Sequence, residues 1–363
     1  MDIKQSKWPK INKFGKLNVK NYLATVGLII AIYFALYLPI AEDGIFSYTG
    51  GIYINILIFM LFAVSLNVVV GLMGQLSLGH AGFIAVGAYG ASVTTQIMTA
   101  MGVMLPSPVQ LLISSVVGGI IACVFGILVA IPTLRLRGDY LAIITLAFGE
   151  IIKYIIQNID FKFKINGQDI FILGGAAGLK NIPNISTFTM VFVIVVISII
   201  IMVMIMTSRQ GRLILSIREN EIAAENIGIQ INKVKVYGFA LASFFAGVGG
   251  SLFAHNTGIL TPDKFGFIFS IEILVMVVLG GLGSITGSIL AAIFLTYLNE
   301  VLRQVSEYRY LVYAIILIVL MIFRPEGIFG TKEFTFSGFV RYIKRNKKNK
   351  RFINKRSGFE RNK

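Results

Sequence analysis

Residues 187–206 read TFTMVFVIVVISIIIMVMIM, a run of 20 residues that contains no charged side chain. An α-helix of about 20 apolar residues has the length needed to cross the hydrocarbon core of a bilayer. A run of this length and composition therefore predicts a membrane-spanning helix.

Nine further apolar windows flank this run. They lie at 22–40, 52–72, 78–100, 109–131, 139–157, 236–254, 268–281, 285–301 and 309–323. The window 268–281 is short for a full crossing, so it is either a half-helix or a re-entrant element, alone or as one broken unit with 285–301. We therefore expect an all-α fold, a polytopic transmembrane helical bundle of about ten spans (8–10).

The composition supports this fold class. Of the 363 residues, 56% are hydrophobic and 14% are charged, and the mean hydropathy is +0.81. Such a chain cannot cover itself with polar side chains in water, which excludes a soluble enzyme, and it is too apolar to be disordered. The single cysteine, Cys123, permits neither a disulfide within the chain nor a thiolate metal cage.

Basic residues concentrate in two tails that flank the apolar body. The tails hold 18 of the 33 Lys and Arg residues. This pattern is typical of cytoplasmic segments that contact anionic headgroups, a reading we prefer to nucleic-acid binding. We expect a basic N-terminal tail at 1–21, a transmembrane domain at 22–330 that includes a cytoplasmic loop at 207–235, and a basic C-terminal tail at 331–363.

The loops indicate the orientation. An even number of spans places both termini on one side, and their charge makes that side the cytoplasm. The loop 132–138, the segment 207–235 and Arg324 then lie inside as well, so that 26 of the 33 basic residues are cytoplasmic. The outside loop 41–51 carries only acids, Glu42 and Asp43, as the same rule predicts.

Several kinds of chemistry are missing from the sequence. It contains no Gly-x-x-x-x-Gly-Lys-Ser/Thr loop to hold ATP phosphates, and its two histidines, His80 and His255, are 175 residues apart. We therefore expect no metal site, no cofactor in this chain and no enzymatic activity of its own.

Polar residues inside the apolar windows, or in the glycine-rich stretch 71–82 between two of them, are candidates for a translocation pathway, because ionisable groups in a bilayer must face protein or water. Glycines cluster beside several of them, either for tight helix packing or where a helix breaks along a cavity. Alternatives remain for three of these residues: Glu150 could pair with Lys153, His80 could be a hydrogen-bonded structural group, and Glu272 could lie near the interface. The candidates are Gln75, Ser77, His80, Glu150 and Glu272.

A different signal lies in the cytoplasmic segment, where 218–228 reads RENEIAAENIG. Asn220 is a good N-cap for a helix of about seven residues, and Gly228 suits the left-handed position after it. So short a helix needs a surface to lie on. Glu219, Glu221 and Glu225 would sit beside anionic lipid, which favours a protein partner over the bilayer.

The spacing Ala223-Ala224-x-x-x-Gly228 resembles the loop that membrane subunits of ABC importers seat in a groove of their ATPase. Ile222 stands where that motif has Glu, with Glu221 one residue earlier. More narrowly, four stretches in order are similar to branched-chain amino acid permeases of the LivM type, and together they cover about residues 50–330. They are GLMGQLSLGHAG at 71–82, RENEIAAENIG at 218–228, GGLGSITG at 280–287 and FRPEG at 323–327.

This resemblance implies a permease subunit in a bacterial-type inner or plasma membrane that forms half of a pathway for leucine, isoleucine and valine. It implies alternating access driven by ATP and Mg²⁺ on two separate ATP-binding cassette subunits, a second permease subunit and an extracytoplasmic binding protein. The coupling residues would be Arg218, Glu219, Asn220, Glu221, Ala223, Ala224, Glu225 and Gly228. Alternatives are a permease for urea, small amides or other amino acids, a stand-alone secondary transporter or channel, and an assembly subunit.

Overall fold

The computed structural model describes residues 48–102, 105–133, 138–165, 168–180 and 182–303, with isolated positions at 33–37 and 311–327. The tails 1–21 and 331–363, the loop residues Arg135 and Arg137, and Arg324 lie outside the described residues. So do most of the windows 22–40 and 309–323.

The described part of the chain is mainly helical, as expected, and each apolar window within it coincides with a helix. The helices are α2 (Tyr48–Asn67), α3 (His80–Ala100), α4 (Ser107–Thr133), α5 (Asp139–Asn158), α6 (Phe188–Thr207), α7 (Arg209–Glu219), α8 (Glu221–Asn226), α9 (Ile231–Thr257), α10 (Phe267–Gly280) and α11 (Ile285–Val301). A π-helical turn, η1 (Val68–Leu72), extends α2, and short 3₁₀ turns occur at η2 (Gly175–Ala177) and η3 (Pro262–Phe265).

The all-α prediction is wrong in one respect, because a β-hairpin interrupts the helices. Strands β1 (Asp160–Ile165) and β2 (Gln168–Gly174) pair antiparallel, with an irregularity in the register between Phe161 and Lys162. The segment 160–165 reads DFKFKI, and its strict polar–apolar alternation is the two-residue period of a strand. That short signal lies in a loop between two long apolar windows.

Among the described residues, four helices are long and apolar enough to cross a membrane. They are α2 with η1, α4, α6 and α9. Two shorter apolar helices, α10 and α11, follow one another across the break at 281–284. The 14 residues of α10 would span about 21 Å at 1.5 Å per residue, which is less than the hydrocarbon core of a bilayer. This length agrees with the predicted half-helix or re-entrant element.

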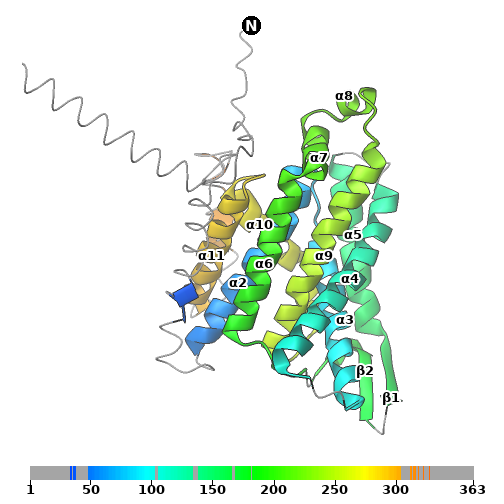
Figure 1. Cartoon of the computed structure of the whole chain (residues 1–363), viewed down its shortest axis with the longest axis vertical. Coiled ribbons are helices and arrows are strands. Elements are labelled where there is room, and N and C mark those ends of the chain that lie inside the picture. Colours follow the sequence, from blue (N-terminus) through cyan, green and yellow to red (C-terminus); the bar gives the residue numbers. More distant parts are fainter. Residues whose placement is uncertain are drawn as a thin grey trace, which may run out of the picture. The chain divides into compact units, whose positions relative to one another are not determined.

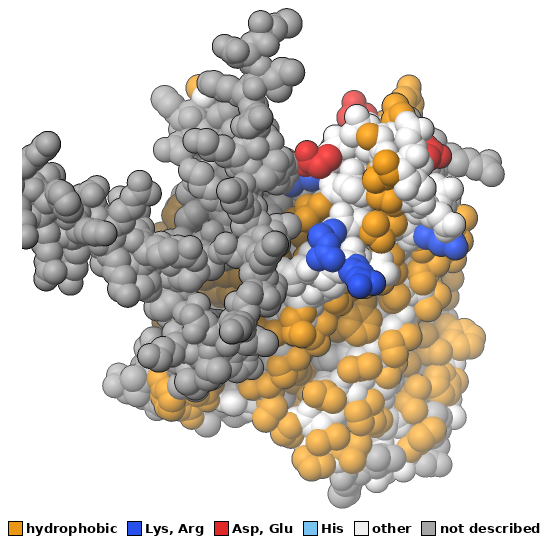
Figure 2. Space-filling model, turned by 45° about the horizontal axis from the view of Figure 1, so that its top comes forward, with side chains coloured by type: hydrophobic (Ala, Val, Ile, Leu, Met, Phe, Trp, Pro, Cys, Tyr) orange, Lys and Arg blue, Asp and Glu red, His pale blue; other side chains and the backbone are white. Residues whose placement is uncertain are grey.

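The outer surface of the bundle is apolar. On α4, large aliphatic side chains are exposed at nearly every fourth position, including Leu112, Val116, Ile120 and Val124. Figure 2 shows hydrophobic side chains spread over the flank of the molecule, with the coloured charged side chains gathered toward its upper part. A continuous apolar stripe facing outward is the arrangement expected of helices in lipid.

The centre of the bundle is α9, which packs against α3 and α4. Gly87 of α3 meets Gly247 of α9 so closely that a Cβ on Gly87 would collide with the Gly247 backbone. Gly250 likewise lies against the backbone of Ile84. Small residues let helix axes approach in lipid, where packing rather than hydrophobic burial holds helices together. These two glycine contacts therefore set the distance between α3 and α9.

The bundle has two distinct ends (Figure 1). The short helix α8 lies beyond the end of α7 at one of them, and the β1–β2 hairpin lies at the other. We refer to these as the α8 end and the hairpin end. Helix α5 runs from the first to the second, because Gly138 lines a pocket with Arg218 of α7 while Asn158 is followed by β1.

Candidate translocation and coupling sites

A pocket of about 470 Å³ lies beside the middle of α5. We call it the Glu150 pocket. Five charged residues line it: Glu150, Lys153, Asp263, Lys264 and Glu272. Four phenylalanines complete most of its wall: Phe59, Phe253, Phe267 and Phe269. It combines an apolar wall with a few charged groups of both signs, as small-molecule sites do.

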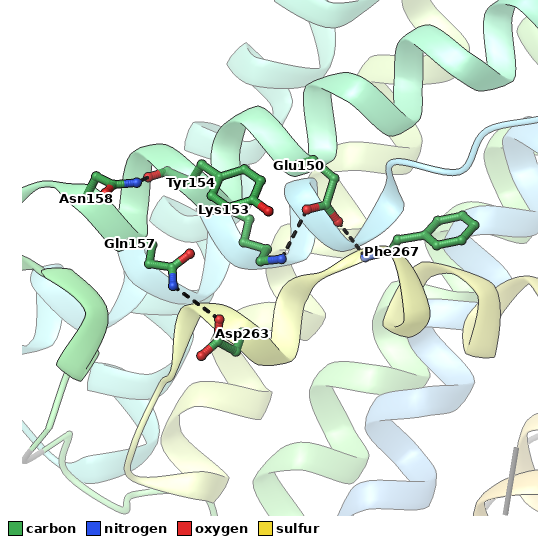
Figure 3. Close-up of polar contacts among 7 residues, drawn as sticks. All are labelled: Glu150, Lys153, Tyr154, Gln157, Asn158, Asp263 and Phe267. Carbon is green, nitrogen blue, oxygen red and sulfur yellow. Dashed lines mark hydrogen bonds and ion pairs between the residues drawn. The ribbon is translucent and has the colours of Figure 1, made fainter.

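Glu150 holds the start of α10 against α5 (Figure 3). Its Oε2 lies 3.1 Å from the Nζ of Lys153, and its Oε1 accepts a 2.7 Å hydrogen bond from the backbone N–H of Phe267. Gly266 precedes α10 and has no side chain that could cap it, so the carboxylate of Glu150 satisfies an N–H at this helix start. The predicted pairing of Glu150 with Lys153 is confirmed, and the contact with Phe267 adds a capping role.

Glu272 lines the same pocket one turn into α10. Its Oε1 accepts a 3.1 Å hydrogen bond from the side-chain amide of Asn299 on α11. The sequence offered no partner close to Glu272, and the structure supplies one 27 residues away. Glu150 and Glu272, chosen separately from the sequence, therefore belong to one site.

The apolar wall of the pocket is a cluster of interlocked rings. Phe269 lies edge-on to Phe59 at a centroid distance of 5.8 Å, and it is tilted against Phe253 at 6.2 Å. Phe265 of η3 contacts both Phe253 and Phe269. Edge-to-face packing of this kind fixes ring positions and gives the pocket a firm hydrophobic side.

His80 is a buried structural group at the start of α3. Its side chain is 1% exposed, and its Nε2 lies 2.8 Å from the Oγ of Ser65 on α2. The next residue, Ala81, donates its N–H to the Oγ of Ser270 on α10 at 3.0 Å. The hydrogen-bonded alternative for His80 is thus confirmed, and the start of α3 meets the first turns of α10 near the Glu150 pocket.

Gln75 and Ser77 lie on the non-helical segment that leads from η1 to α3. Gln75 lines a smaller pocket of about 110 Å³ at the α8 end, together with Arg218, Glu221 and Lys235. Gln75 Oε1 and Ser77 Oγ are buried, and neither has a hydrogen-bond partner among the described residues. This non-helical segment thus connects the pocket at the α8 end with the contact between Ala81 and Ser270. It also places two buried polar groups without hydrogen-bond partners inside the bundle.

The structure builds α8 as the sequence predicts. The side chain of Asn220 accepts a 3.0 Å hydrogen bond from the N–H of Ala223, which is the contact of an N-cap. Gly228 has a φ of 88°, in the left-handed region where a side chain is strained. No group of three His, Cys, Asp or Glu side chains that could hold a metal occurs among the residues described.

The two faces of α8 differ. Ala224 is only 3% exposed, so it packs within the chain, whereas Ile222 is 61% and Ile227 77% exposed. Most other exposed residues of α8 are polar, so two exposed isoleucines on this short helix indicate a contact surface. The outward face is therefore formed by Ile222, Ala223 and Ile227.

Sequence reasoning missed two features of this end of the molecule. The segment 207–235 is not one polar loop, because it contains α7, α8 and the start of α9, with Ser208 capping α7 through the N–H of Gln210. Lys235 is not a solvated cytoplasmic charge, because it is 2% exposed and paired with Glu221. Two local signals could have indicated α7: Ser208 as an N-cap, and the helical spacing of Ile217 from Leu213 (i, i+4) and Ile214 (i, i+3).

These features define a multi-pass membrane protein with a charged, aromatic-walled pocket and a capped helix projecting from one end, the parts expected of a transport permease. Residues 48–323 match the family described as the branched-chain amino acid transport system / permease component, and the chain belongs to this family. The predicted resemblance is thereby confirmed.

Individual relatives agree with the family. The chain is 32% identical to the high-affinity branched-chain amino acid transport system permease protein LivM of Escherichia coli K12, over 75% of this chain and 68% of that protein. It is 26% identical to the ribose import permease protein RbsC of Haemophilus influenzae, over 67% of this chain and 75% of that protein. LivH, a further permease protein of the E. coli K12 system, is 30% identical over 35% of this chain and 41% of its own length. No solved structure matches the chain at a comparable level of significance.

Proposed function

We propose that this chain is one of two permease subunits of an ATP-driven importer for leucine, isoleucine and valine, with both termini in the cytoplasm. It forms half of the translocation pathway and works by alternating access between inward-open and outward-open states. Two separate ATP-binding cassette subunits hold ATP and Mg²⁺, and an extracytoplasmic binding protein delivers the substrate.

Similarity to two relatives from one organism supports the paired permease. LivM and LivH both carry the name of the same high-affinity branched-chain amino acid system, and both match this chain. A second, related permease subunit beside this one follows from that arrangement. The match to a ribose permease shows that family membership does not by itself fix the substrate.

The Glu150 pocket suits a zwitterionic amino acid with an aliphatic side chain. Lys264, and Lys153 beside its partner Glu150, can attract a carboxylate. Asp263, and Glu272 beside Asn299, can attract an ammonium group. The phenylalanine wall can receive the branched side chain. A volume of about 470 Å³ lies within the usual range for small-molecule sites, roughly 300–1,000 Å³.

One observation carries the ATP-driven part of the proposal: α8 projects from the bundle with Ile222 and Ile227 exposed. A six-residue helix is not stable by propensity alone, and its acids disfavour contact with anionic lipid. A groove on an ATPase subunit would cover the two isoleucines and accommodate the small side chain of Ala223. By contrast, a stand-alone transporter has no use for such a helix.

Purification and transport measurements test this function. The full chain is co-expressed with its second permease and two ATP-binding cassette subunits, purified, and reconstituted into proteoliposomes with ATP inside and binding protein outside. Uptake of radiolabelled leucine should require ATP and all subunits. Uptake by this chain alone without ATP would support the secondary transporter. Uptake of ribose or urea in preference to leucine would overturn the substrate assignment.

A further inference from the structure

Two breaks between helices meet at the α8 end. The first is the segment 73–79, where Gly74 has a φ of 72°, and the second is 281–284, where Gly281 and Gly283 have φ of 112° and 89°. Only glycine adopts these conformations without strain. Non-helical backbone of this kind at membrane depth is tolerated where protein buries it or where it lines a cavity.

Asn67 of α2 fixes the second break. Its Oδ1 accepts a 2.9 Å hydrogen bond from the N–H of Gly283, and its Nδ2 donates to the carbonyl of Ser284 at 3.0 Å. Asn67 is fully buried at the junction of α2 and η1, and a Cβ on Gly71 would collide with its side chain and with Gly283. The end of α2 and the α10–α11 break therefore move as one unit.

Arg218 lies between the two breaks. A Cβ on Gly74 would be 3.0 Å from the Cγ of Arg218, and a Cβ on Gly283 would collide with the guanidinium. Arg218 is in the last turn of α7, two residues before Asn220, the N-cap of α8. One side chain thus contacts both breaks from the segment that carries α8. The other charged residues that line the adjoining pocket are Glu221 and Lys235.

We propose that Arg218 transmits movement of α8 to the two glycine breaks, and that the breaks form the gate at the α8 end. This inference rests on the proposed function. When an ATPase subunit displaces α8, the end of α7 moves with it, and the side chain of Arg218 shifts the turns at Gly74 and Gly283 together. Element-terminal residues that absorb φ and ψ changes are the usual hinges of such motions. Arg218 is a positioning residue and need not touch the substrate.

The matched variants are Arg218→Met and Arg212→Met in the complete transporter. Arg212 lies on the same helix, but it is exposed, and its guanidinium donates a hydrogen bond to the nearby carbonyl of Thr207. In Arg218→Met the ATPase subunits should still co-purify and hydrolyse ATP, but leucine uptake per ATP should fall about tenfold, a size typical of coupling between sites. Arg212→Met should transport normally.

Gly283→Ala disturbs the same contact from the other side, because its new Cβ displaces the guanidinium and its φ of 89° strains the break itself. It should also hydrolyse ATP and lose uptake. Normal uptake per ATP in Arg218→Met overturns the proposal, and so does loss of the ATPase subunits, which would make Arg218 a docking contact. Failure of the proposed function itself has a different sign. In that case the unaltered complex would take up leucine without ATP.

Discussion

Glu221, the first residue of α8, forms an ion pair with Lys235 in the second turn of α9. The Lys235 side chain is 3% and the Glu221 side chain 22% exposed. The pair therefore anchors the projecting helix to α9, the helix packed between α3 and α4. Ile222 and Ile227 can face outward because Glu221 and Ala224 hold the other side of α8 in place.

Breaking this pair from one side should destabilise the protein. Glu221→Ala leaves the ammonium of Lys235 buried without its carboxylate, and removing one partner of a fully buried pair costs about 3–5 kcal/mol. We expect a smaller loss here, because Glu221 retains contact with solvent. Thermal unfolding of the purified protein in detergent should show a lower Tm for Glu221→Ala than for Glu225→Ala, which removes an exposed acid. Equal Tm values would contradict an anchoring role.

Replacing Glu272 tests the pathway. Glu272→Gln keeps the size of the side chain and its hydrogen bond to Asn299 but removes the charge from the Glu150 pocket. Leucine uptake should fall while the amount of assembled complex stays the same. Glu300→Gln is the control, because Glu300 sits on α11 at a contact with Tyr48 and Arg303 and does not line the pocket. If Glu272→Gln transports normally, the charge has no role in the pathway.

Replacing glycine by alanine should change the stability of the protein in opposite directions at two positions, one at a contact between helices and one in open space. Gly87→Ala places a methyl group into the backbone of Gly247, and overpacking of this kind costs about 1–3 kcal/mol. Gly51→Ala, in α2, meets nothing within 4 Å and removes a flexible residue from a helix, which favours the fold by about 0.5–1 kcal/mol. The detergent-solubilised yield and Tm should fall for Gly87→Ala alone. A similar response from both variants would mean that α3 and α9 are not closely packed.

Much of the fold could be predicted because a helix that crosses a bilayer needs a long run of apolar residues. Long apolar runs specify helices, so the windows 109–131, 187–206 and 236–254 recur in the structure as α4, α6 and α9 with ends shifted by a few residues. The hairpin was missed because its six-residue alternation is a much weaker signal than a 20-residue run. Helix α7 was missed because its helical repeat is short: Ile214 and Ile217, on its buried face, lie one turn apart within a polar segment.

The candidate sites were predicted unevenly for the same reason. Asn220 and Gly228 act through neighbouring residues, so their roles follow from spacing along the chain. Asn67, Asn299 and Lys235 each contact a partner 14 to 217 residues away, and no local pattern indicates such contacts. The exposure of Ile222 against the burial of Ala224 likewise depends on which side of α8 rests on the protein.

Cysteine labelling tests the orientation of the two ends. With Cys123→Ala as background, Lys162→Cys places a thiol on the exposed hairpin and Asn226→Cys places one on exposed α8. A membrane-impermeant maleimide should label Lys162→Cys in intact cells and Asn226→Cys only after permeabilisation. This follows from the proposed orientation, in which the basic residues of the α8 segment face the cytoplasm. Labelling of Asn226→Cys from outside would reverse the topology.

The outward face of α8 gives the most direct test of docking. Ile227→Asp places a charge where an apolar groove would have to bury it, and burying an unpaired charge is strongly unfavourable. The exposure of Ile227 means that the change leaves the packing of this chain intact. We expect normal insertion and yield, with co-purification of the ATPase subunits reduced by about tenfold or more, which corresponds to roughly 1.4 kcal/mol.

Two further variants separate docking from folding. Ala223→Trp enlarges the exposed face and should also weaken the hold on the ATPase, whereas a helix resting on lipid would tolerate Trp, which favours the bilayer interface. Gly228→Val forces a β-branched residue into the left-handed region and should misplace the end of α8. If Ile227→Asp and Ala223→Trp both retain the ATPase subunits and leucine-stimulated hydrolysis, α8 is not the docking element. The secondary transporter would then be the better account of this chain, because its projecting helix would have no partner to engage.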